Sequence, residues 1–276
     1  MAEKRSGKDY YRKNFFPKNY LNMYLTFVSG ESSHCGTAQA PILDKLHKAF
    51  AEDGIHGDTL IDIGSGASIH QLLAACESFK EIIVTDFLEQ NREEMKRWLM
   101  KDPEAFDWTP VLKYACQLEG DSEKWKEKEE KLRRTIKQVL PCDVTLANPL
   151  DPLVLPPVDC VISTYCLESA CDDLPAYGSA VKNVGSLVKP GGHLIFAAVM
   201  EETYYMVGPH KFDCLWLTPE TVRDAVEGAG FEVLWSQSLG FTFPLQICDA
   251  KDTILIVAKK PSESLVKEPK PVKGTP

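Results

Sequence analysis

The sequence predicts an α/β protein with a doubly wound, mostly parallel sheet. Apolar β-prone runs alternate along the chain with amphipathic helical segments, as in sheets that carry helices on both faces. The first strand, at Leu60–Ile63, opens into Gly64-Ser65-Gly66, where glycines let the backbone turn sharply beside a ligand. A second strand ends at Asp86, about twenty residues beyond this turn, where a carboxylate can accept both hydroxyls of an adenosine ribose. These features predict a nucleoside site.

The remaining elements follow in order along the chain. An aromatic-rich helical segment precedes the first strand, either as a lid over the site or as a helix packed on the core; it consists of Asp9–Tyr11 and Phe15–Phe27. A mostly charged, helical insertion from Trp108 to Leu140 precedes the third strand. The last two strands form an antiparallel pair. We expect helices at Thr37–Glu52, Ser68–Glu77, Glu89–Lys101, Glu123–Val139, Leu174–Val188 and Thr218–Gly228, and strands at Ile82–Asp86, Cys142–Val144, Val158–Thr164, His193–Met200, Phe231–Ser236 and Thr253–Ala258.

Length, charge and cysteine content limit the class of protein. The 276 residues allow one large domain, expected at 1–260, with an N-terminal helical cap at about 9–54 and a disordered tail at 261–276. A net charge of −9 argues against nucleic acid or an anionic membrane as a partner. Nine cysteines without a Cys-x-x-Cys pair, and six histidines without ligand spacing, predict reduced thiols and no metal site. No apolar run approaches the roughly 20 residues of a membrane span, so we expect a soluble protein. The reduced thiols indicate the cytoplasm. We also expect a monomer.

The turn after the first strand also bears on the identity of the cofactor. Ile69 stands where the third glycine of Gly-x-Gly-x-x-Gly supports a pyrophosphate, which argues against NAD. S-adenosylmethionine carries no phosphate, and the shorter turn suits its zwitterionic methionine end. A Gly-x-Gly alone also fits an ordinary structural turn. Because Gly64, Asp86, Asp143 and Thr164 all come at strand ends, however, one crevice can collect them.

The chain resembles the small-molecule methyltransferase family that includes nicotinamide, phenylethanolamine and indolethylamine N-methyltransferases. The similarity extends from about Asp9 to Lys260, and Asn91–Glu94 and the helix around Trp125 are most similar to the indolethylamine branch. The resemblance implies a Rossmann-like class I methyltransferase fold that uses S-adenosylmethionine, with an N-terminal helical lid and a helical insertion before the third strand. The motifs that carry it are Phe15-Phe16-Pro17-Lys18-Asn19-Tyr20-Leu21, Gly57–Gly66, Asp107–Pro110, Leu140–Val144 and Leu187–Leu194.

The resemblance also implies which positions form the cofactor pocket. The family usually has Tyr where this chain has Leu25 and His70, so two contacts to the methionine end are altered. The positions carried over are Tyr11, Tyr20, Gly64, Ser65, Asp86, Phe87, Asn91, Asp143, Val144 and Thr164.

The acceptor side of the resemblance implies an amine. In the nicotinamide enzymes an Asp and nearby serines recognise the carboxamide, whereas this chain has Ala198, Glu202 and Cys214 there. In the phenylethanolamine enzymes two glutamates flank the amine, and Glu168 and Glu202 stand in matching places. Since an alkylamine is protonated at pH 7, carboxylates must bind the cation and carry the proton away, so Glu168 and Glu202 are the expected catalytic pair. The expected substrate residues are Tyr20, Glu168, Ala198, Glu202, Tyr205 and Asp249.

Other interpretations stay open from the sequence. The two glutamates could be surface acids, and Tyr20 and Tyr205 could serve core packing. The acceptor could be nicotinamide or another pyridine. A family member that binds the cofactor with little turnover is also compatible with Leu25 and His70.

Overall fold

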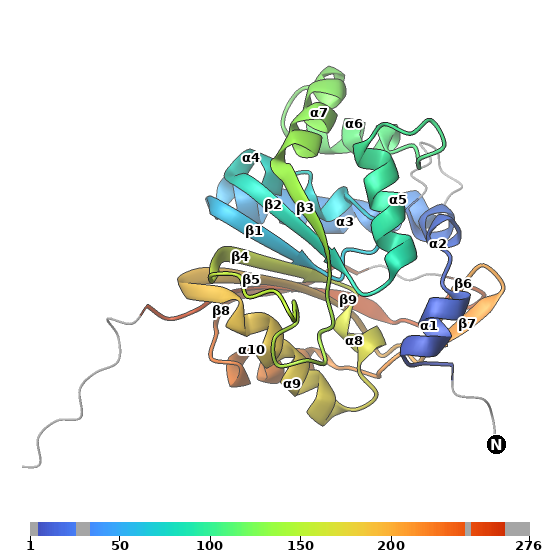
Figure 1. Ribbon diagram of the computed structural model, residues 1–276, viewed down its shortest axis with the longest axis vertical. Helices are drawn as coiled ribbons and strands as arrows, with labels where there is room; N and C mark the ends of the chain where they lie inside the picture. The colour runs from blue at the N-terminus through green and yellow to red at the C-terminus, as the bar shows by residue number, and fades with distance from the viewer. Residues whose placement is uncertain (1–4, 26–33, 241–243, 263–276) are drawn as a thin grey trace, which may run out of the picture.

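A seven-stranded sheet forms the centre of the computed structural model, which describes residues 5–25, 34–240 and 244–262 (Figure 1). The strand order is β3-β2-β1-β4-β5-β9-β8. Strands β1 to β5 pair in parallel, whereas β9 is antiparallel to both β5 and β8. The predicted doubly wound sheet and its antiparallel terminal pair are therefore confirmed. The strands are β1 Gly57–Ile63, β2 Phe79–Asp86, β3 Ile136–Pro141, β4 Val158–Thr164, β5 Val188–Met200, β8 Glu232–Ser238 and β9 Asp252–Lys259.

Strand β1 is where the order of the sheet reverses. Ile61 pairs with Ile83 of β2 on one side and with Val161 of β4 on the other, and its side chain is fully buried. Strands β2 and β3 continue outward from β1 in one direction, and β4 and β5 in the other. In open α/β sheets a ligand crevice forms at such a switch point, outside the carboxyl ends of the strands.

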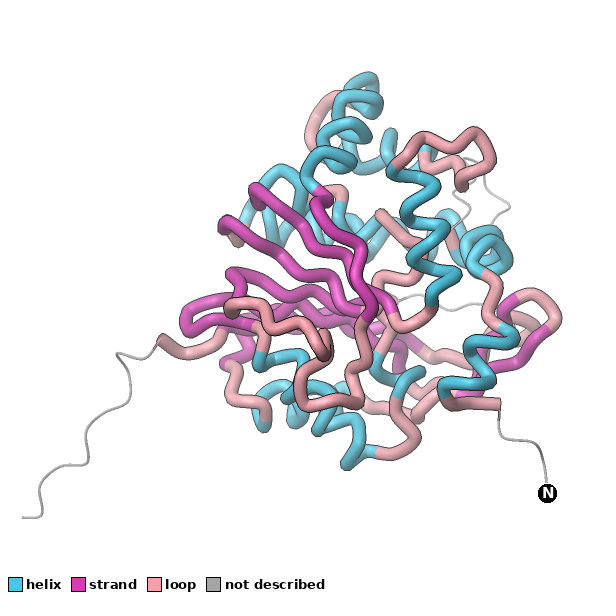
Figure 2. Tube along the Cα trace, viewed as in Figure 1, coloured by secondary structure: helices cyan, strands magenta, loops and turns pink. Residues whose placement is uncertain are grey.

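Helices cover both faces of the sheet and build two separate apolar cores (Figures 1 and 2). One face packs against α3 to α7, where Leu46, Leu112 and Leu132 are buried. The other packs against α9 and α10, where Val181 and Val222 are buried. The helices are α3 His34–His47, α4 Ala75–Ser78, α5 Glu89–Leu99, α6 Thr109–Leu118, α7 Trp125–Thr135, α8 Leu167–Ala170, α9 Leu174–Ser186 and α10 Pro219–Gly228, with short helical turns η1 Lys48–Glu52, η2 His70–Leu72 and η3 Ser122–Lys124.

Two N-terminal helices and a β-hairpin lie together beside the sheet (Figure 1). Helix α1 spans Lys8–Asn14, α2 spans Pro17–Tyr24, and the hairpin consists of β6 Tyr204–Val207 and β7 His210–Asp213. Arg5 bonds to Asp213 through its backbone N–H and its guanidinium, each at 3.0 Å. The Tyr10 hydroxyl donates to the Lys211 carbonyl at 2.9 Å. These contacts tie the N-terminal segment to the hairpin, which the sequence analysis did not anticipate although Gly208 and Pro209 form its turn.

The expected helix at Ser68–Glu77 is wrong in form, although its apolar residues are buried as expected. The Gln71 side chain donates to the Ser68 carbonyl, which a continuous α-helix would use for Leu72. The Leu72 N–H bonds to Ile69 instead, at 3.0 Å. The segment therefore divides into η2 and the short helix α4.

The third strand begins earlier than expected. Helix α7 ends at Thr135, and β3 occupies Ile136–Pro141, ahead of the predicted strand at Cys142–Val144. Strand β3 is at the edge of the sheet, so its polar residues Lys137 and Gln138 are exposed and continue the charged pattern of the helix before it. Thr26 and Phe27 of the expected aromatic segment, and residues 263–276 of the expected tail, lie outside the described residues.

No described helix combines the length and the apolar character that crossing a membrane requires.

Candidate active site

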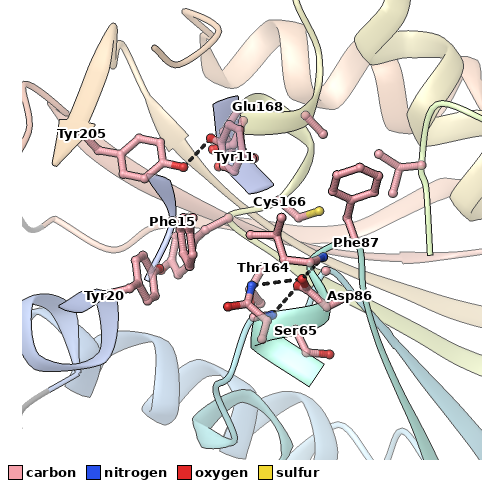
Figure 3. Close-up of a pocket in the computed structure, with 18 of the residues that line it drawn as sticks. Tyr11, Phe15, Tyr20, Ser65, Asp86, Phe87, Thr164, Cys166, Glu168 and Tyr205 are labelled. Atoms are coloured by element: carbon pink, nitrogen blue, oxygen red, sulfur yellow. Dashed lines mark hydrogen bonds between the residues drawn. The ribbon is translucent and has the colours of Figure 1, made fainter. Parts of the chain in front are cut away.

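A cavity of about 510 Å³ lies at the carboxyl ends of the parallel strands (Figure 3). Its walls come from the turn after β1, the ends of β2 and β4, the loop after β3, and the N-terminal helices. All the cofactor positions expected from the sequence line it, as do Glu168, Glu202 and Tyr205. Segments distant in the sequence meet here because parallel strands end at the same edge of the sheet.

The turn after β1 requires glycine at position 64. Gly64 has a φ of 71°, a conformation that residues with a side chain rarely adopt, and a Cβ here would lie 2.1 Å from Sγ of Cys166. The turn is also fixed by hydrogen bonds, since the Ser65 N–H donates to the Thr85 carbonyl at 2.9 Å and the Gly66 N–H donates to Oδ2 of Asp86 at 2.8 Å. The backbone of the turn therefore comes close to whatever occupies the cavity.

Asp86 and Asn91 together offer acceptors for two hydroxyls. The Asp86 carboxylate accepts hydrogen bonds from the N–H groups of Gly66 and Leu88, both at 2.8 Å, and from Nδ2 of Asn91 at 3.0 Å. A carboxylate has about four acceptor positions, so about one remains. Oδ1 of Asn91 is buried and has no partner among the described residues. The geometry therefore offers acceptor atoms on both Asp86 and Asn91, whereas the sequence analysis expected Asp86 alone to accept two hydroxyls.

Phe87 and Asp143 also line the cavity, close to Asp86. Arg12 and Lys8 of the N-terminal segment lie over the Phe87 ring, at 4.7 and 5.7 Å from its centroid. Asp143 forms an ion pair with Lys8 and accepts hydrogen bonds from Thr145, at 3.1 Å from its N–H and 2.6 Å from its hydroxyl. Burial opposes ionisation of Asp143, but these bonds prevail and hold its pKa below the usual range. Helix α1 is thereby fixed over the cavity.

Two glutamates face the other end of the cavity. Glu168, at the start of α8, is 1% exposed; its Oε1 accepts the Val199 N–H at 3.0 Å, and its Oε2 has no partner among the described residues. Burial raises the pKa of Glu168 to about 7; the bond from Val199 opposes this rise and the charge of Glu202 adds to it. The carboxylate is therefore held in place by the Val199 N–H, and its second oxygen is buried without a partner among the described residues.

The second glutamate is similarly buried, but its hydrogen-bond donors are cysteine thiols. Glu202 is 4% exposed, and burial raises its pKa to about 7. Hydrogen bonds from the thiols of Cys214 and Cys248 oppose this shift, whereas the nearby charge of Asp249 adds to it. Because both acids titrate near neutrality, each can hold or release a proton under ordinary conditions.

Tyrosines from three elements enclose the space beside these acids. Tyr11 of α1 and Tyr205 of β6 share a short hydrogen bond between their hydroxyls (Figure 3). Tyr20 of α2 packs against Phe15 and Tyr24, with ring centroids 5.5 and 4.8 Å apart. The result is an aromatic enclosure suited to a flat apolar ring.

Several expected positions do not reach the cavity. Ala198 is fully buried in the core on the α9 face, because alternate residues of a strand point to opposite faces, and its neighbour Val199 lines the cavity instead. Asp249 accepts the N–H groups of Thr203 and Tyr204, at 2.8 and 3.1 Å, and so supports the start of β6. Leu25 is 2% exposed in the apolar core and is likewise absent from the cavity lining.

Some lining residues were not singled out from the sequence. They include Lys8, Ser169 and Cys248. Lys8 and Asp143 are far apart in the chain, and no local pattern in the sequence signals their ion pair. Within the described ranges, no group of three or more His, Cys, Asp or Glu residues is arranged to hold a metal ion.

The sequence matches the NNMT/PNMT/TEMT family over residues 3–261. It is 52% identical to indolethylamine N-methyltransferase of Oryctolagus cuniculus, over 83% of this chain and 86% of that protein. It is 48% identical to nicotinamide N-methyltransferase of Homo sapiens, over 94% of this chain and 98% of that protein. The fold is similar to magnesium protoporphyrin IX methyltransferase from Synechocystis PCC 6803 with bound SAM, with a TM-score of 0.56 and 10% identity over 91% of this chain and 94% of the other. The resemblance inferred from the motifs is thereby confirmed.

Proposed function

The chain belongs to the NNMT/PNMT/TEMT family and is an S-adenosylmethionine-dependent N-methyltransferase, for which we propose a small arylalkylamine of the indolethylamine type as the methyl acceptor. The observation that carries the proposal is the buried pair Glu168 and Glu202, with Oε2 of Glu168 free of protein partners in the described chain. A cationic amine gives these acids a partner of opposite charge.

The cavity fits the cofactor. The sharp glycine turn, with no room for a Cβ at Gly64, lets the backbone approach a ligand closely, and the free acceptors of Asp86 and Asn91 suit a ribose. Phe87 and Asp143 would hold the adenine. When bound, S-adenosylmethionine supplies an electrophilic methyl group on a sulfonium. The protein's part is then to orient the acceptor and to exclude water.

Glu168 and Glu202 would perform the acid–base work. An alkylamine is an ammonium at pH 7 and has no lone pair with which to attack. In a buried site a carboxylate that accepts its N–H both holds the cation and takes its proton. With a pKa near 7, Glu168 can accept that proton at neutral pH and later release it.

A pyridine acceptor is the second candidate. It is favoured by the 48% identity with human nicotinamide N-methyltransferase, which extends over almost all of both chains. A pyridine nitrogen is already unprotonated at pH 7 and would make no use of the acids as bases. A carboxamide N–H could still donate to one of the glutamates.

One assay separates these candidates. Formation of S-adenosylhomocysteine is measured with tryptamine, phenylethanolamine and nicotinamide as acceptors, each over a range of concentrations. The proposal expects a higher kcat/KM for an arylalkylamine than for nicotinamide. A preference for nicotinamide would establish the pyridine candidate instead. Binding of S-adenosylhomocysteine without turnover of any acceptor would indicate a cofactor-binding protein.

We also infer that the enzyme is monomeric and cytoplasmic. The cysteines whose side chains the structure describes are free thiols, as expected in a reducing compartment. Light scattering during size-exclusion chromatography tests the first point, with 30.9 kDa expected for the monomer.

A further inference from the structure

Tyr177 is a buried polar group that the mechanism above leaves unused. It lies in α9, its side chain is 1% exposed, and its ring packs edge-on against Phe196 of β5, with the two centroids 6.4 Å apart. Its hydroxyl has no hydrogen-bond partner among the described residues. Leaving a buried hydroxyl unpaired is costly, and phenylalanine would fill the same space without that cost. The hydroxyl therefore needs an explanation that packing alone does not provide.

A buried acceptor without a partner lies close to this hydroxyl. Helix α8, which carries Glu168, contacts α9, and its neighbours Leu167 and Cys171 share one apolar core with Tyr177. Among the charges that act on the Tyr177 hydroxyl, that of Glu168 has the largest effect. Oε1 of Glu168 accepts the Val199 N–H, whereas Oε2 has no partner among the described residues. An unpaired donor and an unpaired acceptor are thus buried in the same region.

The Tyr177 hydroxyl remains protonated and can serve as a donor. Burial raises the pKa of Tyr177 well above its usual value, and the charge of Glu168 adds to the rise. A hydrogen bond donated to a carboxylate favours its ionised form. Within the described ranges, the other titratable groups that face Glu168 are neutral or acidic, and one of them, the Tyr165 hydroxyl, also interacts with Thr253 of β9. These groups are Tyr20 of α2, Tyr165 and Cys166 after β4, Cys171 after α8, Glu202 after β5 and Cys214 after β7.

We propose that Tyr177 is a positioning residue for the acid–base step, whose hydroxyl donates to Oε2 of Glu168, directly or through one bridging water, once this carboxyl has lost its proton. The inference rests on the proposed function and adds to it a residue outside the cavity lining. A carboxylate oxygen has two acceptor positions, so the tyrosine hydroxyl and the ammonium of the substrate can both bond to Oε2. Tyr177 thereby holds the carboxylate in one orientation and stabilises its charge from the core side.

Titration of the Glu168 carboxyl in the free enzyme tests the proposal without turnover. It is followed by NMR in protein with isotope-labelled glutamate carboxyls, and Glu168→Gln assigns the resonance. Loss of a hydrogen bond to a charged group should raise the pKa of Glu168 in Tyr177→Phe by about 1 to 2 from its value of about 7. Tyr114→Phe, on α6, removes a hydroxyl that bonds to Asp44 at 2.7 Å and is the matched control. An unchanged pKa of Glu168 in Tyr177→Phe, or an equal rise in Tyr114→Phe, would overturn the proposal.

Two further measurements separate this role from packing in the core. Because the pKa of Glu168 in the folded protein already exceeds that in the unfolded chain, a further rise extends the loss of stability to higher pH. In urea, Tyr177→Phe should match or exceed the parent at about pH 4, and its unfolding constant should be about 10- to 50-fold larger than that of the parent at pH 9. In a Glu168→Gln background the same change should lose this pH dependence.

The kinetic readout follows the same carboxyl. The rising limb of the pH profile of kcat/KM for tryptamine should move to higher pH by about 1 to 2 in Tyr177→Phe, whereas the profile for quinoline should stay unchanged. Equal effects on the two acceptors, or a loss of stability that is the same at both pH values, would reduce Tyr177 to a packing role and overturn the proposal.

Failure of the proposal is distinguishable from failure of the proposed function. If the wild-type enzyme methylates none of the acceptors, the function fails, while the titration of Glu168 still decides whether Tyr177 bonds to it. If Tyr177→Phe does not fold, the parent supplies the test: the ring resonance of Tyr177 next to its hydroxyl should shift with a midpoint near pH 7, and this shift should vanish in Glu168→Gln. A resonance that does not respond to pH would contradict the proposal. A rise in the pKa of Glu168 in Tyr165→Phe and not in Tyr177→Phe would assign the role to Tyr165 instead.

Discussion

Replacing Glu168 by Gln should make the free enzyme more stable in mild alkali while it disables amine methylation. Burial raises the pKa of this carboxyl from 4.5 to about 7, so the folded protein holds the proton more tightly than the unfolded chain. The stability that this proton contributes is full below pH 4.5 and is lost as the pH rises through about 7. By the free-energy equivalent of a pKa shift, the loss amounts to about 3 kcal/mol.

Glu168→Gln removes the ionisation and keeps the shape of the side chain. Its Oε1 can still accept the Val199 N–H, which is 3.0 Å away in the parent. In urea unfolding of the free enzyme we expect the variant to match the parent at about pH 4 and to exceed it at pH 8, by up to about 3 kcal/mol. Glu232→Gln, an exposed acid on β8, is the control and should behave as the parent at both pH values.

The kinetic effect of the same change should be the opposite. Loss of the carboxylate removes both the ion pair with the ammonium and the base, so kcat/KM for tryptamine should fall about 10²- to 10³-fold. Methylation of quinoline, which carries no proton to lose, should fall less than about 3-fold, the size expected for a lost weak contact. Glu168→Gln,Glu202→Gln should widen this difference. Equal losses for the two acceptors, or no gain of stability at pH 8, would refute the reasoning.

Three further predictions concern the cofactor end. Asp86→Ala should weaken S-adenosylhomocysteine binding at least about 30-fold by calorimetry, because charge-assisted hydrogen bonds are lost; an unchanged Kd in a folded variant would contradict the ribose assignment. Gly64→Ala should lose both thermal stability and cofactor binding, since its Cβ would lie 2.1 Å from Sγ of Cys166. Adding Cys166→Ala should restore only part of the stability and binding, because the positive φ at position 64 remains unfavourable for alanine. Full recovery would show that the contact with Cys166 accounts for the whole loss. In hydrogen exchange, residues 8–24 should become more protected when S-adenosylhomocysteine and an amine bind, and Lys8→Met, which removes an ion pair of α1, should reduce that protection; unchanged exchange would exclude a closing lid.

The sequence predicted best the elements whose environment is uniform. Strand β4, at Val158–Thr164, is buried on both faces and therefore appears as an apolar run with the bounds expected. Strand β3 is at an edge, where polar residues are tolerated, and was placed too late in the chain. The hairpin Tyr204–Asp213 was missed, because its fixing contacts come from Arg5 and Tyr10, which are distant in sequence.

Some residues of the site could likewise be predicted from the sequence, and others could not. Residues at strand ends, such as Gly64, Asp86 and Thr164, could be grouped in advance because parallel strands share an edge. Ala198 could not be separated from Val199 without the register of β5, since a shift of one residue reverses the face. Nor could the sequence show that protein donors already occupy most of Asp86.

The proposed selectivity for an amine would follow from the way burial couples the two glutamates to their ligand. Near pH 7 each acid is only partly ionised, because burial and the neighbouring charge both favour the proton. A bound ammonium reverses this balance, since an opposite charge in a buried site favours the ionised carboxyl. The cation thus generates the base that removes its own proton, whereas a neutral pyridine leaves the acids protonated and gains nothing from them. Amine binding should therefore release protons to the buffer near pH 7, and calorimetry in buffers of different ionisation enthalpy can count them. Proton release of the same size with nicotinamide would show that the acids respond to occupancy of the cavity rather than to charge.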